Sequence, residues 1–270
     1  MFDRADAPQP SPHFVAAIAR AGYRAQLADC PLFAGVSPED CARAYESARL
    51  RVFSRGDVLY MDEAPVRDVF LLLYGVAKIT KCGAAGDIVI VGLGMPGDVL
   101  GAADLIATGK HSTTAQPARQ GCALVWRAAD FRAMVNVLPV LFRNMLTCQH
   151  RRSREVEERL QEMATDTIAP RVARQLLRLR EKFIRAADES VDLSFSREEV
   201  AQMTGTTLFS ISRLLVEWEQ LGIVTSKRES VRICDVASLR AVSEGARRSD
   251  AGLCRNSLCK STKTRGNAAV

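Results

Sequence analysis

The sequence predicts an α+β protein in which an N-terminal antiparallel β-roll, a long dimerisation helix and a C-terminal winged helix-turn-helix follow one another. Short apolar runs separated by glycine fill residues 51–126, and residues 139–163 continue after Pro139 without glycine or proline. Two short helical patterns then meet at Gly205. Strand-length runs, one long helical run and a glycine-joined helix pair are the elements of that architecture.

Length and charge narrow the class of protein. The chain has 270 residues, 47% of them apolar, which suits two modest domains better than one. Residues 1–170 carry 19 basic and 19 acidic side chains, whereas residues 171–270 carry 18 and 12, so the formal net charge of +6 lies wholly in the C-terminal part. This distribution favours a polyanionic partner such as double-stranded DNA at that end, and a basic solubilising tail is the alternative.

The sequence predicts a cytoplasmic protein with no membrane partner. No apolar run reaches the roughly eighteen residues of a membrane span, and the first residues lack a signal core. The eight cysteines form no CxxC pair, and no histidine stands at zinc-finger spacing. We therefore predict no metal site and expect most cysteines to be buried thiols.

The N-terminal part begins with helices and continues with strands. Residues 14–30 and 38–48 have helical periodicity, and Ser37 or Pro38 opens the second helix as its cap or first-turn residue. From residue 51 the runs are short and many are β-branched, which predicts an antiparallel roll or barrel. The breaks between runs contain Gly56, Gly75, Gly86 and Gly97.

The long helix that follows has a stripe suited to pairing with a second copy of the chain. Side chains of the stripe recur every three or four residues, namely Met145, Gln149, Arg152, Val156, Leu160 and Met163. A dimer-forming coiled coil is the interpretation we favour. An ordinary helix packed on its own roll is the alternative.

The next segment predicts a helix-turn-helix. A helix over 170–183 leads into a polar loop, after which Ser196 and Glu199 form a capping box that fixes a helix start at Arg197. Gly205 supplies the turn, and Thr206 or Thr207 caps the second helix. The residues expected to face inward are Val200, Ala201, Met203, Ile211, Leu214, Leu215 and Trp218.

A β-hairpin wing and a tail complete the chain. Residues 223–225 and 231–233 are β-branched runs, and Ser226, Lys227 and Arg228 between them give the wing a basic tip. The polar residues after 247 predict a disordered basic tail. The predicted domains are a β-roll over 27–135, a dimerisation helix over 136–165, a winged helix-turn-helix over 166–244 and a tail over 245–270.

The order of these elements resembles that of the Crp/Fnr family, the group of the cyclic-AMP receptor protein and the fumarate-nitrate regulator, over residues 27–242. The most specific stretch, SREEVAQMTGTTLFSISRLLVEWEQLGIV, is similar to the family's DNA-binding signature. The roll is similar to the cyclic-nucleotide-binding barrel in its glycine spacing (RGD, LLYG, AAGD, PGD) and in its CPLFAGV entry. The resemblance implies a homodimeric transcription regulator with a sensor roll and a near-palindromic DNA operator, and RNA polymerase as a partner if the protein is an activator.

Within that resemblance the second helix of the pair is the recognition helix, starting near Leu208. Arg213 falls where the family places an arginine that contacts guanine O6 and N7. Phe209 stands where a glutamate is usual, and we consider contact with a thymine methyl or packing against the wing or core. The predicted DNA-binding residues are Thr207, Leu208, Phe209, Ser210, Ser212, Arg213, Lys227 and Arg228.

The roll departs from the pattern of the cyclic-AMP receptor proteins. By the resemblance, Ala102 replaces a ribose-binding glutamate, and His111 beside Ser112 replaces a phosphate-binding arginine. Val156 and Glu157 stand in place of the hydroxyl pair that reaches the purine. Alanine offers a ribose hydroxyl no acceptor, and histidine is a poor substitute for a bidentate guanidinium. We predict a ligand pocket around these five residues that does not bind cyclic AMP.

The sequence leaves the cofactor unknown. Only Cys30 and Cys41 precede the roll, so Cys122 lacks the partners that a four-thiolate iron–sulfur cluster requires. Haem-based gas sensing and thiol-based redox sensing are the alternative functions within the family. The candidate haem ligands are His13, His111, His150 and Cys82, and the candidate thiols are Cys82, Cys122 and Cys148.

Two functions outside gene regulation fit the sequence less well. A ligand-binding module, such as the nucleotide-binding subunit of a kinase or channel, would need neither a helix-turn-helix nor a basic C-terminal part, and this chain has both. No Ser/His/Asp, paired-carboxylate or metal-ligand constellation can be placed in the sequence, so we do not expect an enzyme.

Overall fold

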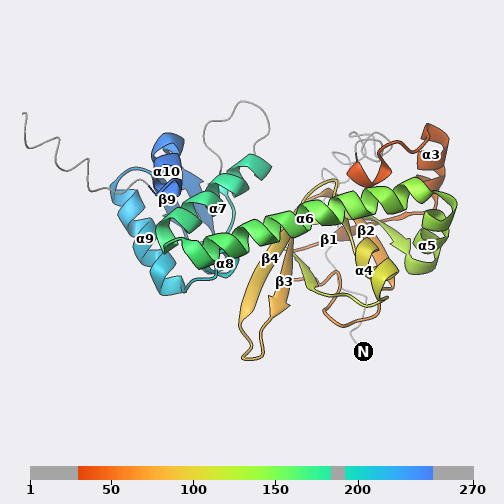
Figure 1. Cartoon of the computed structure of the whole chain (residues 1–270), viewed down its shortest axis with the longest axis horizontal. Coiled ribbons are helices and arrows are strands. Elements are labelled where there is room, and N and C mark those ends of the chain that lie inside the picture. The colour runs from red at the N-terminus through yellow and green to blue at the C-terminus, as the bar shows by residue number, and fades with distance from the viewer. Residues whose placement is uncertain (1–29, 184–191, 246–270) are drawn as a thin grey trace, which may run out of the picture. The chain divides into compact units, whose positions relative to one another are not determined.

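The computed structural model describes residues 30–183 and 192–245, and the chain divides into two compact units between Gln161 and Glu162, within one long helix (Figure 1). Residues 1–29, most of the polar loop after Phe183 and nearly all of the predicted tail lie outside the described residues, so the expectations for these segments do too. The predicted α+β class is confirmed, because each unit combines helices with an antiparallel sheet.

The described part of the first unit contains a roll made of two antiparallel sheets. In the order of the larger sheet, the strands are β1 (Arg49–Phe53), β7 (Gly121–Arg127), β2 (Asp68–Tyr74) and β5 (Val99–Leu100). In the order of the smaller sheet, they are β4 (Ile88–Gly94), β3 (Ala77–Cys82) and β6 (Thr114–Pro117). Beyond β1 the apolar run over 52–60 leaves the sheet, and its last residue, Tyr60, makes an isolated bridge to Ala115.

Strand β2 is buried on both faces, which explains its unbroken apolar sequence. Val69, Leu71 and Leu73 point into a core shared with the surrounding helices. Phe70 and Leu72 point the other way, into the space between the two sheets. A strand that is covered on both sides shows a continuous apolar run in place of alternation, so β2 lies at the centre of the roll.

The turn after β2 requires glycine. Gly75 has a φ of +88°, and a Cβ added to it would lie 2.7 Å from the Cα of Gly121 in the neighbouring strand. Both the left-handed backbone and the close approach exclude a side chain. The three other glycines that we placed at breaks between strands also have positive φ angles, as expected for turns.

Helices cover one face of the larger sheet. They are η1 (Pro31–Phe33), α3 (Pro38–Glu46), α4 (Ala102–Ala107), α5 (Ala128–Val137) and the first part of α6 (Pro139–Thr165). The predicted start of α3 is confirmed, since the Ser37 side chain accepts a hydrogen bond from the backbone N–H of Asp40 and Pro38 is the first helical residue. The sequence analysis missed α4, whose six residues are too short to show helical periodicity.

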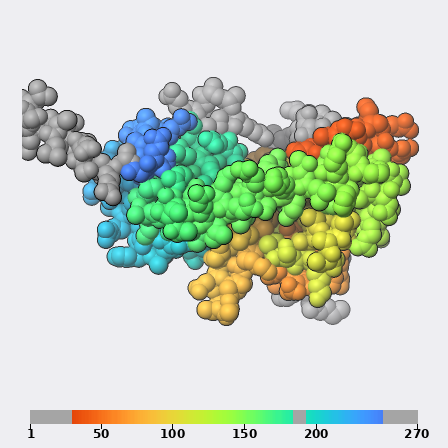
Figure 2. Space-filling model, viewed as in Figure 1, coloured from red at the N-terminus to blue at the C-terminus, as the bar shows by residue number. Residues whose placement is uncertain are grey.

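The long helix predicted over 139–163 is confirmed as α6, with 27 residues. Its first turns pack on the roll through the buried Leu141 and Met145. Asn144 fixes this contact, because its side-chain amide donates to the carbonyls of Leu32 at 2.9 Å and Ala34 at 2.7 Å. In Figure 2 the outer side of α6, in green, lies at the surface.

The second unit contains a helix-turn-helix and a small sheet. Its elements after α6 are α7 (Ile168–Phe183), β8 (Asp192–Leu193), α8 (Arg197–Thr204), α9 (Leu208–Gln220), β9 (Val224–Lys227), β10 (Ser230–Ile233) and α10 (Val236–Ser243). The antiparallel pair β9 and β10 confirms the predicted hairpin, and β8 extends it on the β10 side. We did not predict α10, which Asp235 caps by accepting a hydrogen bond from the N–H of Ser238. Among the described helices, none has the length and hydrophobicity needed to span a lipid bilayer.

Candidate nucleic-acid interface and roll pocket

Local capping positions the two helices of the helix-turn-helix. The predicted capping box is present, since the Ser196 hydroxyl accepts from the N–H of Glu199 and the Glu199 carboxylate accepts from the N–H of Ser196. Gly205 ends α8 with a φ of +60°, and Thr207 caps α9 by accepting from the N–H of Ser210. Residues predicted to face inward are buried, except Leu214, which is half-buried.

The N-terminal half of α9 presents the predicted base-reading face to solvent. Phe209 has 76% of its surface exposed, Leu208 has 49%, and Arg213 is exposed too. Packing of Phe209 against the wing or core, which we considered from the sequence, is therefore wrong. Ser212 is half-buried, and no described residue pairs with the Arg213 guanidinium.

The wing is attached to both helices of the pair. Arg197 at the start of α8 donates to the Ser226 hydroxyl at 2.6 Å, and Glu219 near the end of α9 accepts from the Ser226 N–H. The bonds to Ser226 hold the pKa of the Glu219 carboxyl below its usual value, which keeps this acceptor ionised. Lys227, at the end of β9, and Arg228, in the turn, are both exposed. The hairpin thus presents two cations from a fixed base.

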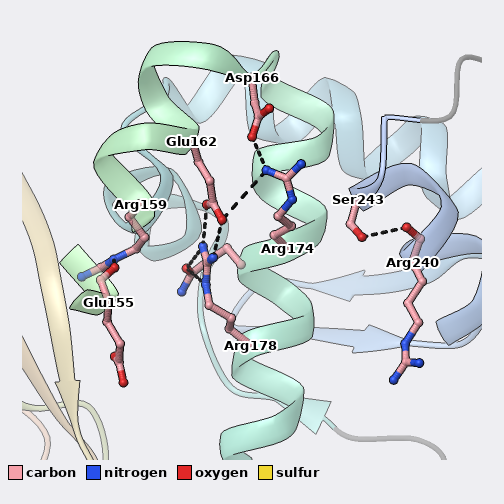
Figure 3. A network of polar contacts seen from close by, with 9 residues as sticks. Glu155, Arg159, Glu162, Asp166, Arg174, Arg178, Arg240 and Ser243 are labelled. Carbon is pink, nitrogen blue, oxygen red and sulfur yellow. Dashed lines mark hydrogen bonds and ion pairs between the residues drawn. The ribbon is translucent and has the colours of Figure 1, made fainter. Parts of the chain in front are cut away.

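The last turns of α6 are fastened to the helix-turn-helix. A Cβ added to Gly205 would lie 2.6 Å from Met163 Cε, so the Met163 side chain lies directly against the turn. Arg178 on α7 donates to the Glu162 carboxylate through two nitrogens at 2.6 and 2.9 Å (Figure 3). Arg174 pairs with Asp166 on the same side (Figure 3).

The sequence analysis missed this acid–base network. Glu162 and Asp166 are four residues apart on α6, and Arg174 and Arg178 are four apart on α7, so each pair shares a helix face. That matched spacing of acidic and basic residues was the available signal. It does not identify the partner of each pair, because the contacts join two different helices.

A cavity of about 200 Å³ lies in the first unit between the roll and α6. Of the five residues predicted to form a ligand pocket, Ala102, Ser112 and Val156 line this cavity, and His111 and Glu157 do not. Glu157 is exposed and accepts a hydrogen bond from Ser153 at 3.2 Å.

His111 lies behind the cavity wall. It is 3% exposed and stacks flat on Tyr60, with the ring centroids 3.8 Å apart. Burial raises the pKa of the Tyr60 hydroxyl to about 12. The Nδ1 of His111 is 3.6 Å from Asp104 Oδ2, too far for a hydrogen bond, and Asp104 instead accepts from the Ser112 hydroxyl at 2.9 Å. The Ser112 side chain is thus already engaged by a carboxylate.

Arginines that the sequence analysis did not assign to the pocket connect α6 to the roll. Arg152 donates to the carbonyl of Val99 at 3.4 Å. Two turns further along α6, Arg159 donates to the carbonyls of Ile90 and Val91 in strand β4. Both arginines line the cavity, and their nitrogens bond to main-chain oxygens of its rim. These contacts hold α6 against the roll on the cavity side.

The outward stripe of α6 differs from the predicted one. Met145 is buried and Arg152 bonds to the roll, so these two members of the predicted stripe face inward. The prediction had the correct spacing but included residues from the inner side of the helix. The exposed apolar side chains on α6 are Phe142, Leu146, Val156, Leu160 and Met163.

The candidate sensor thiols and histidines lie in different surroundings. Burial raises the pKa of the Cys122 thiol to about 11, so this cysteine is protonated at neutral pH and is a poor nucleophile. Cys82 and His150 are exposed, whereas Cys148 is half-buried and lines the cavity. His13 lies outside the described residues.

Comparison with known proteins matches both units. Residues 170–242 match the family model of the Crp-like helix-turn-helix domain, and residues 50–137 match that of the cyclic nucleotide-binding domain. The nitrogen fixation regulation protein FixK of Bradyrhizobium diazoefficiens is 25% identical over 203 residues, 74% of this chain and 84% of FixK. The cyclic AMP receptor protein of Thermus thermophilus is 23% identical over 80% of this chain and 97% of its own length. The solved structure of FixK2 from Bradyrhizobium japonicum superposes with a TM-score of 0.64 at 20% identity, covering 72% of this chain and 96% of that one.

Proposed function

We propose that this chain, which belongs to the Crp/Fnr family of DNA-binding transcription regulators, binds a near-palindromic operator as a homodimer and regulates transcription in the cytoplasm in response to a signal other than cyclic AMP. The observation that carries this proposal is the uncovered N-terminal half of α9, where Arg213 and Phe209 are exposed on a capped and anchored helix. A recognition helix reads base edges with its N-terminal residues in the major groove.

The division of labour in DNA binding follows from the side chains. The planar Arg213 guanidinium matches the O6 and N7 acceptors of guanine, which supplies sequence discrimination. Lys227 and Arg228 on the wing are exposed charges suited to phosphates, which position the protein without reading sequence. Thr207 and Ser210 bond to each other at the start of α9, so we assign them to backbone positioning.

The surface of α6 supports a dimer. Positions 142, 146, 149, 153, 156, 160 and 163 are alternately four and three residues apart, the spacing of a two-stranded coiled coil. Five of the seven are exposed apolar residues, and Gln149 and Ser153 are the polar pair in the middle. A second copy would cover this surface and place two recognition helices on successive half-sites. If the regulator is an activator, we propose RNA polymerase as a further partner.

The cavity supports a signal other than cyclic AMP. Ala102 brings no acceptor for a ribose hydroxyl, and Val156 brings no donor for a purine. His111 is buried behind Tyr60, where it cannot replace an arginine that holds a phosphate. A nucleotide would therefore lose the charge-assisted and hydroxyl contacts that fix it.

The test is selection of bound sites from a random duplex library, followed by footprinting and titration with cyclic AMP. We expect a near-palindrome with half-sites about one helical turn apart and an affinity that millimolar cyclic AMP leaves unchanged. Failure to enrich any sequence with or without the nucleotide would contradict the regulator. Enrichment only with cyclic AMP present would contradict the assignment of the signal.

A further inference from the structure

We infer that Phe209, together with Leu208, forms an apolar reading surface that selects a thymine by its C5-methyl group in each half-site. This inference rests on the proposed function, because it assumes that α9 enters the major groove. It assigns the apolar end of the helix to one chemical feature of one base.

The inference begins with an exposed apolar pair that the fold does not use. Ile211, Leu215 and Trp218 already form the buried side of α9. Phe209 is 76% exposed and the adjacent Leu208 is 49% exposed, on the first turn of the helix. Since large apolar groups contribute to stability only when they leave water, neither exposed surface is explained by folding.

The surroundings of Phe209 favour DNA as the partner. Arg213 lies one helical turn further along the same face, so an element that contacts Arg213 also passes over Phe209. No acidic residue stands in the first turn of α9, and the acidic Glu217 and Glu219 lie near its other end. The apolar surface is thus continuous with the cationic base-reading face and free of charges that would repel phosphate.

The chemistry of the major groove then identifies the contact. A phenyl ring offers no hydrogen-bond acceptor or donor, so it cannot read an amino or carbonyl group. The one apolar group exposed in the major groove is the C5-methyl of thymine, and phenylalanine is among the side chains that contact it. Four residues of α-helix rise about 6 Å, and base steps are about 3.4 Å apart, so the thymine should lie within about two base pairs of the G·C pair that Arg213 reads.

Replacing thymine by deoxyuridine removes only the methyl group and tests this contact directly. In a site selected from a random duplex library, each thymine is replaced in turn and the dissociation constant is measured with the full chain. At one position in each half-site we expect the wild-type protein to lose about fourfold in affinity, the value of one buried methyl, and about 15-fold when both half-sites are changed.

Variants connect this loss to the side chain. Phe209→Ala should bind the thymine and uracil duplexes equally, whereas Phe209→Leu, which keeps an apolar contact, should retain a preference for thymine. Val216→Ala is the matched control, because Val216 is an exposed apolar residue two turns further along nearly the same face of α9, and it should keep the wild-type ratio. The exposure of Phe209 leads us to expect the same thermal midpoint for Phe209→Ala as for the wild type.

The outcomes separate this inference from the proposed function. If the wild-type protein selects a site but no thymine-to-uracil change matters, or if Phe209→Ala keeps the wild-type ratio, the methyl contact is wrong and the regulator stands. If Phe209→Ala alters the sedimentation of the protein without altering that ratio, the apolar pair serves a protein partner and the inference is overturned. If no site is selected, the proposed function fails first.

Discussion

The contact between Gly205 and Met163 makes the attachment of α6 to the helix-turn-helix measurable. Gly205→Ala places a Cβ in a left-handed backbone with a φ of +60° and 2.6 Å from Met163 Cε. The backbone term costs about 1 kcal/mol, at the low end for a non-glycine residue in that region. Displacing the Met163 methyl from the turn adds about another 1 kcal/mol, so we expect a total near 2 kcal/mol.

Gly222→Ala is the matched control for the backbone term. Gly222 follows α9 as Gly205 follows α8, has a φ of +70° and would place its Cβ in open space. Hydrogen exchange in the full chain, read by mass spectrometry on peptides of α8 and α9, reports the local opening free energy. We expect amides to exchange about 30-fold faster in Gly205→Ala and about fivefold faster in Gly222→Ala.

A double-mutant cycle isolates the side-chain contact. In a Met163→Ala background, Gly205→Ala should accelerate exchange only about fivefold, because no methyl remains to be displaced. Equal effects of Gly205→Ala in the two backgrounds would show that Met163 does not pack on the turn. Equal effects of Gly205→Ala and Gly222→Ala would refute the reasoning in the same way.

Two further predictions concern the dimer and the wing. Leu146→Asp, on the exposed stripe of α6, should convert a dimer of twice 29.5 kDa to a monomer in sedimentation, while Leu221→Asp, at a similarly exposed apolar residue after α9, should not; a wild-type monomer that still bound a palindromic site tightly would contradict the coiled coil. Lys227→Ala with Arg228→Ala should weaken binding to operator and random DNA alike, and should reduce the slope of log affinity against log salt by about one unit for each phosphate that the wing no longer binds; an effect on operator DNA alone would mean that the wing reads bases.

Features that depend on neighbouring residues could be predicted from the sequence. The capping box of Ser196 and Glu199, the glycine turn at Gly205 and the Ser37 cap each need only three or four consecutive positions, and all are present. The roll could be predicted because its turns require glycine and its strands are β-branched. These signals are local, so the rest of the fold does not alter them.

Features that depend on tertiary contacts could not be predicted in the same way. Periodicity along α6 gave the spacing of a stripe but not its direction, so Met145 and Arg152, which face the roll, were assigned to the outer side. The pairing of Glu162 with Arg178 joins helices whose relative placement the sequence does not specify. Alignment to a motif put His111 in the pocket, whereas the structure stacks it on Tyr60 behind the cavity wall.

The measurement that tests the central claim most directly is the affinity of Arg213→Ala for the selected operator and for random DNA at one salt concentration. Arg213 is exposed on α9 and pairs with no described residue, so the substitution should leave the fold intact. We expect a loss of about 1 to 3 kcal/mol on the operator, a much smaller loss on random DNA and relaxed preference at one G·C pair in each half-site. Equal losses on both DNAs would show that Arg213 contacts only phosphate, and that α9 is not the element that reads the sequence.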